Sequence, residues 1–220
     1  MDDMRLTRRS GLKKLAGGAL LLGALTVSGL GTARAGPDQT ELLGRAKATL
    51  TEAQHDPQFG TAKDLFQRAR AVMVVPQLVK GGLFFGGEGG NGVLMTRGAD
   101  GTWGNPLFYT IGAVSFGLQI GIEVAEVVLF VMSDHALKAW TEDEVKLGAK
   151  AGLTVLVVGS NAEAATTTHG NVDVIAWAKS KGAYAGITLE GSVIKPRNEW
   201  NEAYYGHPVV PSVVLKNSGR

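Results

Sequence analysis

Glycine is the feature of this sequence that most constrains its fold. The chain has 31 glycines among 220 residues, and many of them interrupt stretches that otherwise have the composition of β-strands. A glycine inside a strand weakens it and often marks a bulge, a bend or the close approach of another backbone. We therefore expect a strongly bent, glycine-rich sheet, a sandwich or a half-barrel, in preference to a flat sheet.

The first 35 residues are typical of an export signal. Basic residues precede an uncharged stretch at 15–30, and Ala33-Arg34-Ala35 supplies an A-x-A cleavage site. The uncharged stretch is shorter than the roughly 20 residues of a transmembrane helix, although a retained membrane anchor stays an alternative. Thr7–Lys13 is similar to a twin-arginine signal, with the general secretory route also open. We predict removal of 1–35, which leaves 36–220 as a single periplasmic or secreted domain, with peripheral membrane association.

The signal hides the charge of the mature chain. Residues 1–35 contain six basic and two acidic residues, so the other 185 residues carry 16 basic and 18 acidic ones, a net charge of −2 with histidine neutral. A negative chain is not expected to bind nucleic acid, so any anion-binding surface is a local patch. The chain has no cysteine, which excludes disulfides, thiolate metal sites and a catalytic thiol.

The spacing of apolar residues predicts two helices followed by a run of strands. The helices are expected at 38–54 and 61–71, with further short helices at 133–140 and 198–205. The strands are expected at 72–75, 78–96 (a hairpin), 108–124, 127–132, 153–158, 172–179, 183–194 and 209–215. Because strands mostly follow strands, we predict an α+β fold in which two N-terminal helices pack on a mostly antiparallel sheet.

Two of these strands carry specific expectations. The strand at 72–75 is expected to stop at Pro76, because proline cannot donate a hydrogen bond within a sheet. At 108–124 the apolar residues occupy even positions, from Phe108 to Val124, whereas the odd positions are mostly small or polar. A period of two means that one face is buried, so we expect the even residues to lie inside. The stretch is too long for one flat strand, so its glycines are expected to mark bends or bulges.

The sequence shows no catalytic or metal-binding constellation. A G-x-G-x-x-G pattern at 87–92 is followed by Val93-Leu94-Met95 rather than by the helix that a dinucleotide site needs, so we predict a hairpin tip there. The four histidines are widely spaced and form no metal-ligand pattern. No serine lies in a G-x-S-x-G motif. We therefore predict no enzyme activity, no cofactor and no metal.

Basic residues near aromatic rings form the candidate binding site. If the strands at 172–179 and 183–194 form a hairpin, two lysines lie at its turn and a Lys-x-Arg pair lies at its opposite end, which makes two small patches. Ordinary solvated charge is the alternative explanation. The candidate residues are Arg68, Arg70, Lys80, Phe84, Phe85, Lys179, Lys181, Tyr184, Lys195 and Arg197.

Five blocks of the sequence resemble the SYLF domain family. They are Lys80-Gly81-Gly82-Leu83-Phe84-Phe85-Gly86-Gly87, Gly92-Val93-Leu94, Gly117-Leu118-Gln119-Ile120-Gly121, Gly159-Ser160-Asn161-Ala162-Glu163-Ala164 and Ser180-Lys181-Gly182-Ala183-Tyr184-Ala185-Gly186-Ile187-Thr188-Leu189-Glu190-Gly191-Ser192. In their order and spacing the blocks cover residues 60–206, nearly the whole predicted mature chain.

The resemblance implies a lipid-binding domain. On this hypothesis the chain binds anionic phospholipid or phosphoinositide-like head groups at a membrane surface, through basic patches and neighbouring apolar side chains. The alternative is a protein-interaction module, because some eukaryotic relatives also bind actin filaments, and an enzyme with an unrecognised site comes third. The expected partners are therefore anionic phospholipids or a membrane surface, with a protein partner as the alternative and no nucleic acid.

Overall fold

The computed structural model describes residues 36–57, 59–60, 62–82, 85–116, 121–148, 150, 152–159, 172–181 and 188–217. All of them belong to the compact unit formed by Gly31–Arg220. The predicted export signal at 1–35 lies outside the described residues.

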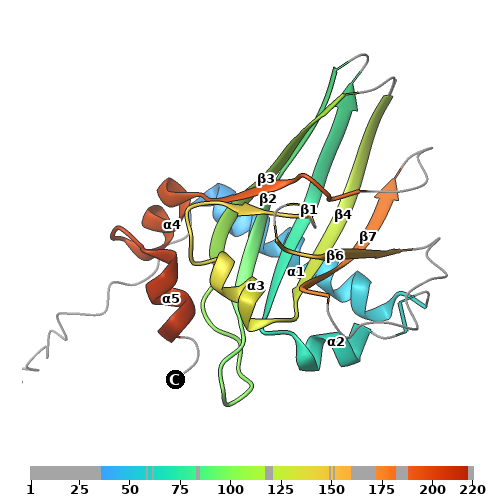
Figure 1. Cartoon of the computed structure of the whole chain (residues 1–220). Helices are drawn as coiled ribbons and strands as arrows, with labels where there is room; N and C mark the ends of the chain where they lie inside the picture. Colours follow the sequence, from blue (N-terminus) through green and yellow to red (C-terminus); the bar gives the residue numbers. More distant parts are fainter. Residues whose placement is uncertain are drawn as a thin grey trace, which may run out of the picture. The chain divides into compact units, whose positions relative to one another are not determined.

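A sheet of eight strands, counted over the described residues, forms the centre of this unit (Figure 1). The strands are β1 (Ala71–Gly82), β2 (Phe85–Thr96), β3 (Leu107–Phe116), β4 (Gly121–Val131), β5 (Val145–Lys146), β6 (Val155–Gly159), β7 (Val174–Lys181) and β8 (Val193–Pro196). Their order across the sheet is β5-β8-β3-β2-β1-β4-β7-β6. All neighbouring pairs are antiparallel except β6 with β7. The sheet curls into a half-barrel, which confirms the predicted α+β fold.

Two helices cover one face of the sheet, which we call the helical face. They are α1 (Pro37–His55) and α2 (Ala62–Arg68), and they confirm the predicted helices at 38–54 and 61–71, the second in a shorter form. The helices bury Leu42, Ala46 and Leu65 against sheet residues such as Trp177. The indole N–H of Trp177 also donates to Asp56, just beyond α1, at 2.9 Å.

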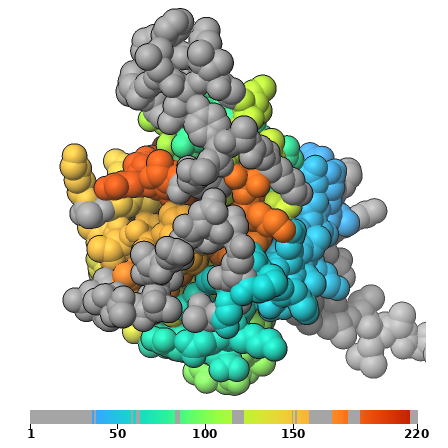
Figure 2. Space-filling model, turned by 90° about the vertical axis from the view of Figure 1, so that its right-hand side faces the viewer, coloured from blue at the N-terminus to red at the C-terminus, as the bar shows by residue number. Residues whose placement is uncertain are grey.

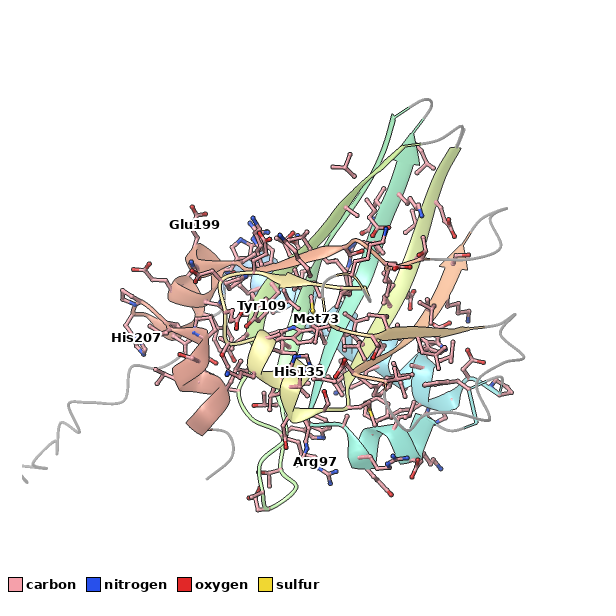
Figure 3. The ribbon with its side chains drawn as sticks, in the orientation of Figure 1. Met73, Arg97, Tyr109, His135, Glu199 and His207 are labelled. Atoms are coloured by element: carbon pink, nitrogen blue, oxygen red, sulfur yellow. The ribbon has the colours of Figure 1, made fainter. Side chains whose placement is uncertain are left out.

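The opposite face, which we call the inner face, lies within the curl of the sheet. Its core includes Met73 and Tyr109, both fully buried. Figure 3 shows these two side chains within the body and Glu199 and His207 at its margin, where both are exposed. The inner face therefore has an apolar core of its own, separate from the core under α1 and α2.

Three short helices complete the described structure: α3 (Asp134–Ala139), α4 (Asn198–Tyr205) and α5 (Pro211–Asn217). The first two confirm the predicted helices at 133–140 and 198–205. The Ser133 hydroxyl caps α3 by accepting from the Ala136 amide at 3.0 Å. The predicted strand at 209–215 is wrong, since α5 occupies that segment. Pro211 opens this helix, and the fixed φ of proline suits the first helical position.

Pro76 does not end its strand, contrary to the prediction. The strand β1 runs on to Gly82, and the register with β2 shifts between Val74 and Gln77. Three steps along β1 there match two steps along β2, from Val93 to Asn91. One extra residue is the defining feature of a β-bulge, which is a place in a sheet that tolerates proline.

The glycine-rich segment 87–92 lies inside β2, so the predicted hairpin tip at these residues is wrong. Two of its glycines lie beside the bulge, where the backbones come close together. A Cβ atom at Gly90 would lie 2.5 Å from the carbonyl oxygen of Gln77, and one at Gly92 would lie 2.6 Å from the Met73 methyl carbon. Close packing of the strands therefore requires glycine at Gly90, because the atom it would meet belongs to the backbone.

The period-two segment 108–124 divides into most of β3 and the start of β4, and residues 117–120 lie outside the described ones. The expected burial of the even positions is wrong at Val114 and Ile122, which are exposed. The odd-numbered Glu123 is buried instead. The alternation correctly indicated strands, but it gave the wrong inner and outer faces at this end of the sheet.

The predicted hairpin between 172–179 and 183–194 is also wrong. The strand β7 pairs with β4 and β6, whereas β8 pairs with β3 and β5. Four strands separate β7 from β8 in the sheet. The cations of these two segments therefore belong to different regions of the surface.

Candidate binding surface

The distal ends of four strands form a projection that we call the arm. It consists of residues 79–82 of β1, 85–89 of β2, 112–116 of β3 and 121–124 of β4, which are paired in one continuous register. Figure 1 shows these strands extending together beyond the helices, toward the top of the view. The pairing of β8 with β3 stops at Gly112, and that of β7 with β4 stops at Val124. Among the described residues, β3 and β4 are therefore the two outer strands of the arm.

Exposed aliphatic side chains lie on the helical face of the arm. Val114 is 76% exposed and Ile122 is 79% exposed. In the strand register these two residues end a row whose central members are Gly87 and Gly81. Val79, 39% exposed, lies in the next row of the same face. In the row of Val114 and Ile122 the face is thus a glycine-floored trough between two aliphatic side chains, and Val79 lies on its floor one row further along. Exposed apolar patches often mark interaction sites.

A groove beside α1 leads into this trough. It has a volume of about 340 Å³, and its lining residues are Arg45, Ala48, Thr49 and Glu52 from α1 with Pro76, Gln77, Val124 and Glu126 from the sheet. Arg45 donates to the Gln77 side-chain oxygen at 2.9 Å, and the Thr49 hydroxyl donates to Glu126 at 3.0 Å. Val124 lines the groove and is also the strand partner of Val79 in the arm. The groove and the trough therefore form one continuous surface.

Four of the predicted cations are engaged in ion pairs. The pairs are Arg68 with Asp64 (3.2 Å), Arg70 with Asp134 (3.2 Å), Lys195 with Glu144 (2.8 Å) and Lys179 with Glu52. The hydrogen bond to Glu52 raises the pKa of Lys179. Hydrogen bonds from Lys195 and then Lys146 lower the pKa of Glu144. Because a carboxylate accompanies each of these four cations, their attraction for an external anion is reduced.

The remaining predicted residues are placed separately. The Arg197 guanidinium stacks over the Trp200 ring, 3.9 Å from its centroid, and donates to Asn91 at 3.1 Å. Lys80 lies in the arm, on the inner face. Phe84 and Tyr184 lie outside the described residues, as do the side chains of Phe85 and Lys181.

The described cations do not share one surface. Lys179 lies on β7 next to α1, and the side view in Figure 2 shows β7 (orange) beside α1 and α2 (blue to turquoise). Lys195 lies on β8, near the other end of the sheet. Lys195 and Arg197 lie close together along the chain, but the structure places neither of them beside Lys179.

The sequence analysis missed the exposed ridges of the arm. Val114 and Ile122 were assigned to a buried face because they continue the apolar alternation of their strands. The signal that identifies them is the glycine opposite each one, Gly87 beside Val114 and Gly81 beside Ile122. That signal becomes visible only when the register between the strands is known.

A second cavity, of about 420 Å³, lies between α3 and β5. Its lining carries charges of both signs, with His135, Lys138 and Lys146 near Glu142 and Glu144. The His135 ring lies 3.5 Å from Asp173. Hydrogen bonds from Ser133 and Thr154 outweigh the effect of burial and lower the pKa of Asp173. Lys146 pairs with Glu144 at 3.0 Å, and the lining residues include no nucleophile paired with a general base.

Two further observations concern the described part of the chain. Within the described ranges, His, Asp and Glu side chains do not gather in groups of three or more that could hold a metal ion. In the same ranges, no helix combines the length and apolarity needed to cross a bilayer.

Fold and surface together define an α+β half-barrel domain with an exposed apolar arm and an adjoining groove. A family model named Ysc84, described as "Las17-binding protein actin regulator", matches residues 112–220. The chain belongs to this family, the Ysc84 or SYLF domain family, as the sequence blocks predicted.

Several curated proteins are similar to this chain. LAS seventeen-binding protein 3 of Saccharomyces cerevisiae is 33% identical over 160 residues, which cover 71% of this chain and 34% of the relative. Protein YSC84 of the same yeast is 33% identical over 159 residues, covering 71% of this chain and 33% of the relative. The human SH3 domain-containing YSC84-like protein 1 is 31% identical over 134 residues, which cover 60% of this chain and 39% of the relative. The chain thus spans about a third of the length of these relatives.

Proposed function

We propose that this chain is a non-enzymatic binding domain that docks on a partner protein through the helical face of its arm. The observation that carries the proposal is the pair of exposed ridges, Val114 and Ile122, on either side of a floor of glycine. One similar protein is named LAS seventeen-binding protein 3, and the matching family is described as "Las17-binding protein actin regulator". Their names support a protein partner for this chain as well.

The geometry of the arm suits such docking. The trough has no side chains along its floor at Gly81 and Gly87, so a partner can approach the backbone closely. Burial of one aliphatic side chain contributes about 2 kcal/mol, which is roughly a 30-fold change in affinity. Val114 and Ile122 together therefore supply enough free energy to control binding, and the groove at Arg45 and Gln77 adds polar partners beside them.

Co-sedimentation with actin filaments is the first test, because the family description names an actin regulator. The comparison is between residues 36–220 and the double variant Val114→Ser, Ile122→Ser. The matched control is Val210→Ser, Val213→Ser, since these valines are also exposed (59% and 54%) but lie at α5. We expect the arm variant to lose binding and the control to keep it. Equal sedimentation of all three proteins with the filaments would refute docking through the arm.

Binding of anionic phospholipid is the second candidate function. The observation that favours it is the sequence between the strands of the arm: Leu83-Phe84 separates β1 from β2 along the chain, and Leu118 and Ile120 belong to the segment between β3 and β4. A projecting arm with such apolar residues could insert into a bilayer, and the basic residues proposed from the sequence, from Arg68 to Arg197, would assist. The ion pairs of four of these basic residues reduce their attraction for an anionic membrane. We therefore expect membrane binding to depend only weakly on salt.

Vesicle sedimentation separates the two candidates. Neutral and anionic phospholipid vesicles are compared at low and high salt with the same three proteins. Pelleting with anionic vesicles in the absence of any binding to filaments would favour the membrane function over the protein partner. Absence of pelleting with both vesicle types would refute the membrane function.

The proposed location follows from the predicted signal. We place the mature domain outside the cytoplasm, in the periplasm or secreted, after removal of residues 1–35. The intact mass of the protein recovered from its host tests this location, because cleavage predicts a chain that begins at Gly36. A mass that includes Met1 would contradict it.

A further inference from the structure

An alternating row of charged residues crosses the inner face of the arm. Lys80 of β1 is paired in register with Glu88 of β2 on one side and with Glu123 of β4 on the other. Residues directly opposite each other in neighbouring strands point to the same face of the sheet. The three side chains therefore project together, on the face opposite Val114 and Ile122.

Two carboxylate oxygens of this row are buried without a partner. Glu123 is only 5% exposed, and its Oε1 atom has no hydrogen bond. Glu88 accepts a hydrogen bond at Oε1 from the hydroxyl of Ser192, which is fully buried, at 2.6 Å, but its Oε2 atom has none. Leaving a buried carboxylate oxygen without a hydrogen bond costs more free energy than leaving a neutral polar group without one, because the carboxylate is charged. Both oxygens therefore call for a hydrogen-bond donor that these residues do not supply.

Three glycines follow the row on the inner face of the arm. The next positions of the same face, toward the end of the arm, are Gly82, Gly86 and Gly121, which have no side chains. Lys80 and Glu88 are partly exposed, so two of the three side chains of the row reach solvent. Only Glu123 lies fully inside.

The charge of the row indicates the chemistry of the ligand. Two carboxylates and one ammonium group leave a net charge of −1, which one monovalent cation neutralises. A divalent metal ion prefers more oxygen ligands than two carboxylates provide, and Lys80 would repel its double charge. A primary ammonium group carries a single charge and three hydrogen-bond donors.

We infer that the inner face of the arm binds a small organic cation through Glu123 and Glu88, with a primary ammonium group as the recognised chemistry. In this site the ammonium group donates to Oε1 of Glu123 and Oε2 of Glu88, and Lys80 limits the affinity by repulsion. The site is separate from the proposed docking face, since the two lie on opposite faces of the arm.

Calorimetric titration of residues 36–220 with ethylammonium tests this inference. We expect saturable binding that weakens about tenfold or more in Glu123→Gln, because a charged hydrogen bond is lost. In Lys80→Met we expect tighter binding, because the repelling charge is removed. Glu142→Gln, an exposed carboxylate outside the arm, is the control and should bind as the unaltered protein does.

Other cations establish which chemistry the site recognises. Tetramethylammonium has the same charge but no donor, and calcium has more charge, so both should bind more weakly than ethylammonium. No saturable binding of ethylammonium, equal binding by Glu123→Gln, or weaker binding by Lys80→Met would each overturn the inference. A thermal unfolding transition shows that each variant is folded. If Glu123→Gln does not fold, Glu88→Gln takes its place in the test.

Discussion

Asn201 fastens α4 to the sheet through a pair of hydrogen bonds. Its side-chain oxygen accepts from the Phe108 amide at 2.7 Å, and its side-chain nitrogen donates to the Phe108 carbonyl at 3.0 Å. Asn201 and Phe108 are both fully buried. The Phe108 carbonyl also accepts from the Arg197 amide at 2.8 Å. Substitution Asn201→Ala therefore leaves the Phe108 N–H without a partner, while the carbonyl keeps one.

The expected loss of stability follows from these contacts. A buried donor without a partner costs about 1–3 kcal/mol, and the second lost hydrogen bond about 1 kcal/mol. We therefore expect Asn201→Ala to lower the free energy of unfolding by about 2–4 kcal/mol, a large part of the roughly 5–15 kcal/mol that stabilises a typical domain.

Urea denaturation followed by tryptophan fluorescence measures this loss. Trp200 lies beside Asn201, and Trp177 reports on the core under α1. The matched control is Asn198→Ala, because Asn198 begins the same helix but is exposed. We expect the control to stay within about 0.5 kcal/mol of the unaltered protein. If Asn201→Ala is as stable as Asn198→Ala, the reasoning about the two hydrogen bonds is wrong.

Two further predictions concern the bulge and a surface ion-pair network. Gly90→Ala should lower stability by about 1–3 kcal/mol in the same urea assay, because its methyl group would meet the Gln77 carbonyl; unchanged stability would contradict the close approach of the strands. Glu144 has a lowered pKa in the folded state through Lys195 and Lys146, so its contribution is present above its ordinary pKa and is lost as the pH falls through the lowered value. Glu144→Gln should therefore melt below the unaltered protein at pH 7, with the two melting temperatures converging in acid, and a constant difference would contradict this linkage.

The sequence correctly predicted those helices and strands whose boundaries depend on residues nearby in the chain. The start of α3 depends on Ser133, whose hydroxyl caps the helix as serine commonly does. The end of β1 was misplaced because a bulge at Pro76 depends on both neighbouring strands. The segment at 209–215 has β-branched residues typical of a strand, yet its proline at the first helical position and its contacts with the core favour a helix. Tertiary packing overrode propensity in that segment.

The candidate surface was harder to predict than the fold. Alternation at Val114 and Ile122 correctly indicated strands, but burial depends on what covers a face, and the arm extends beyond α1. The cations at Lys179 and Lys195 were placed in one hairpin because their segments are neighbours in sequence, whereas the sheet order separates them. Ion pairing with Glu52 and Glu144 involves residues distant along the chain, so it too could not be derived from spacing.

The extra residue between Val74 and Gln77 sets the orientation of everything beyond it on β1. Side chains alternate strictly along a regular strand, so without the bulge the residues from Gln77 onward would face the side opposite to the one they face here. Val79 would then turn toward the acidic neighbours Glu88 and Glu123, and Lys80 would turn to the aliphatic side. The bulge in the middle of β1 thus determines which chemistry each side of the arm presents.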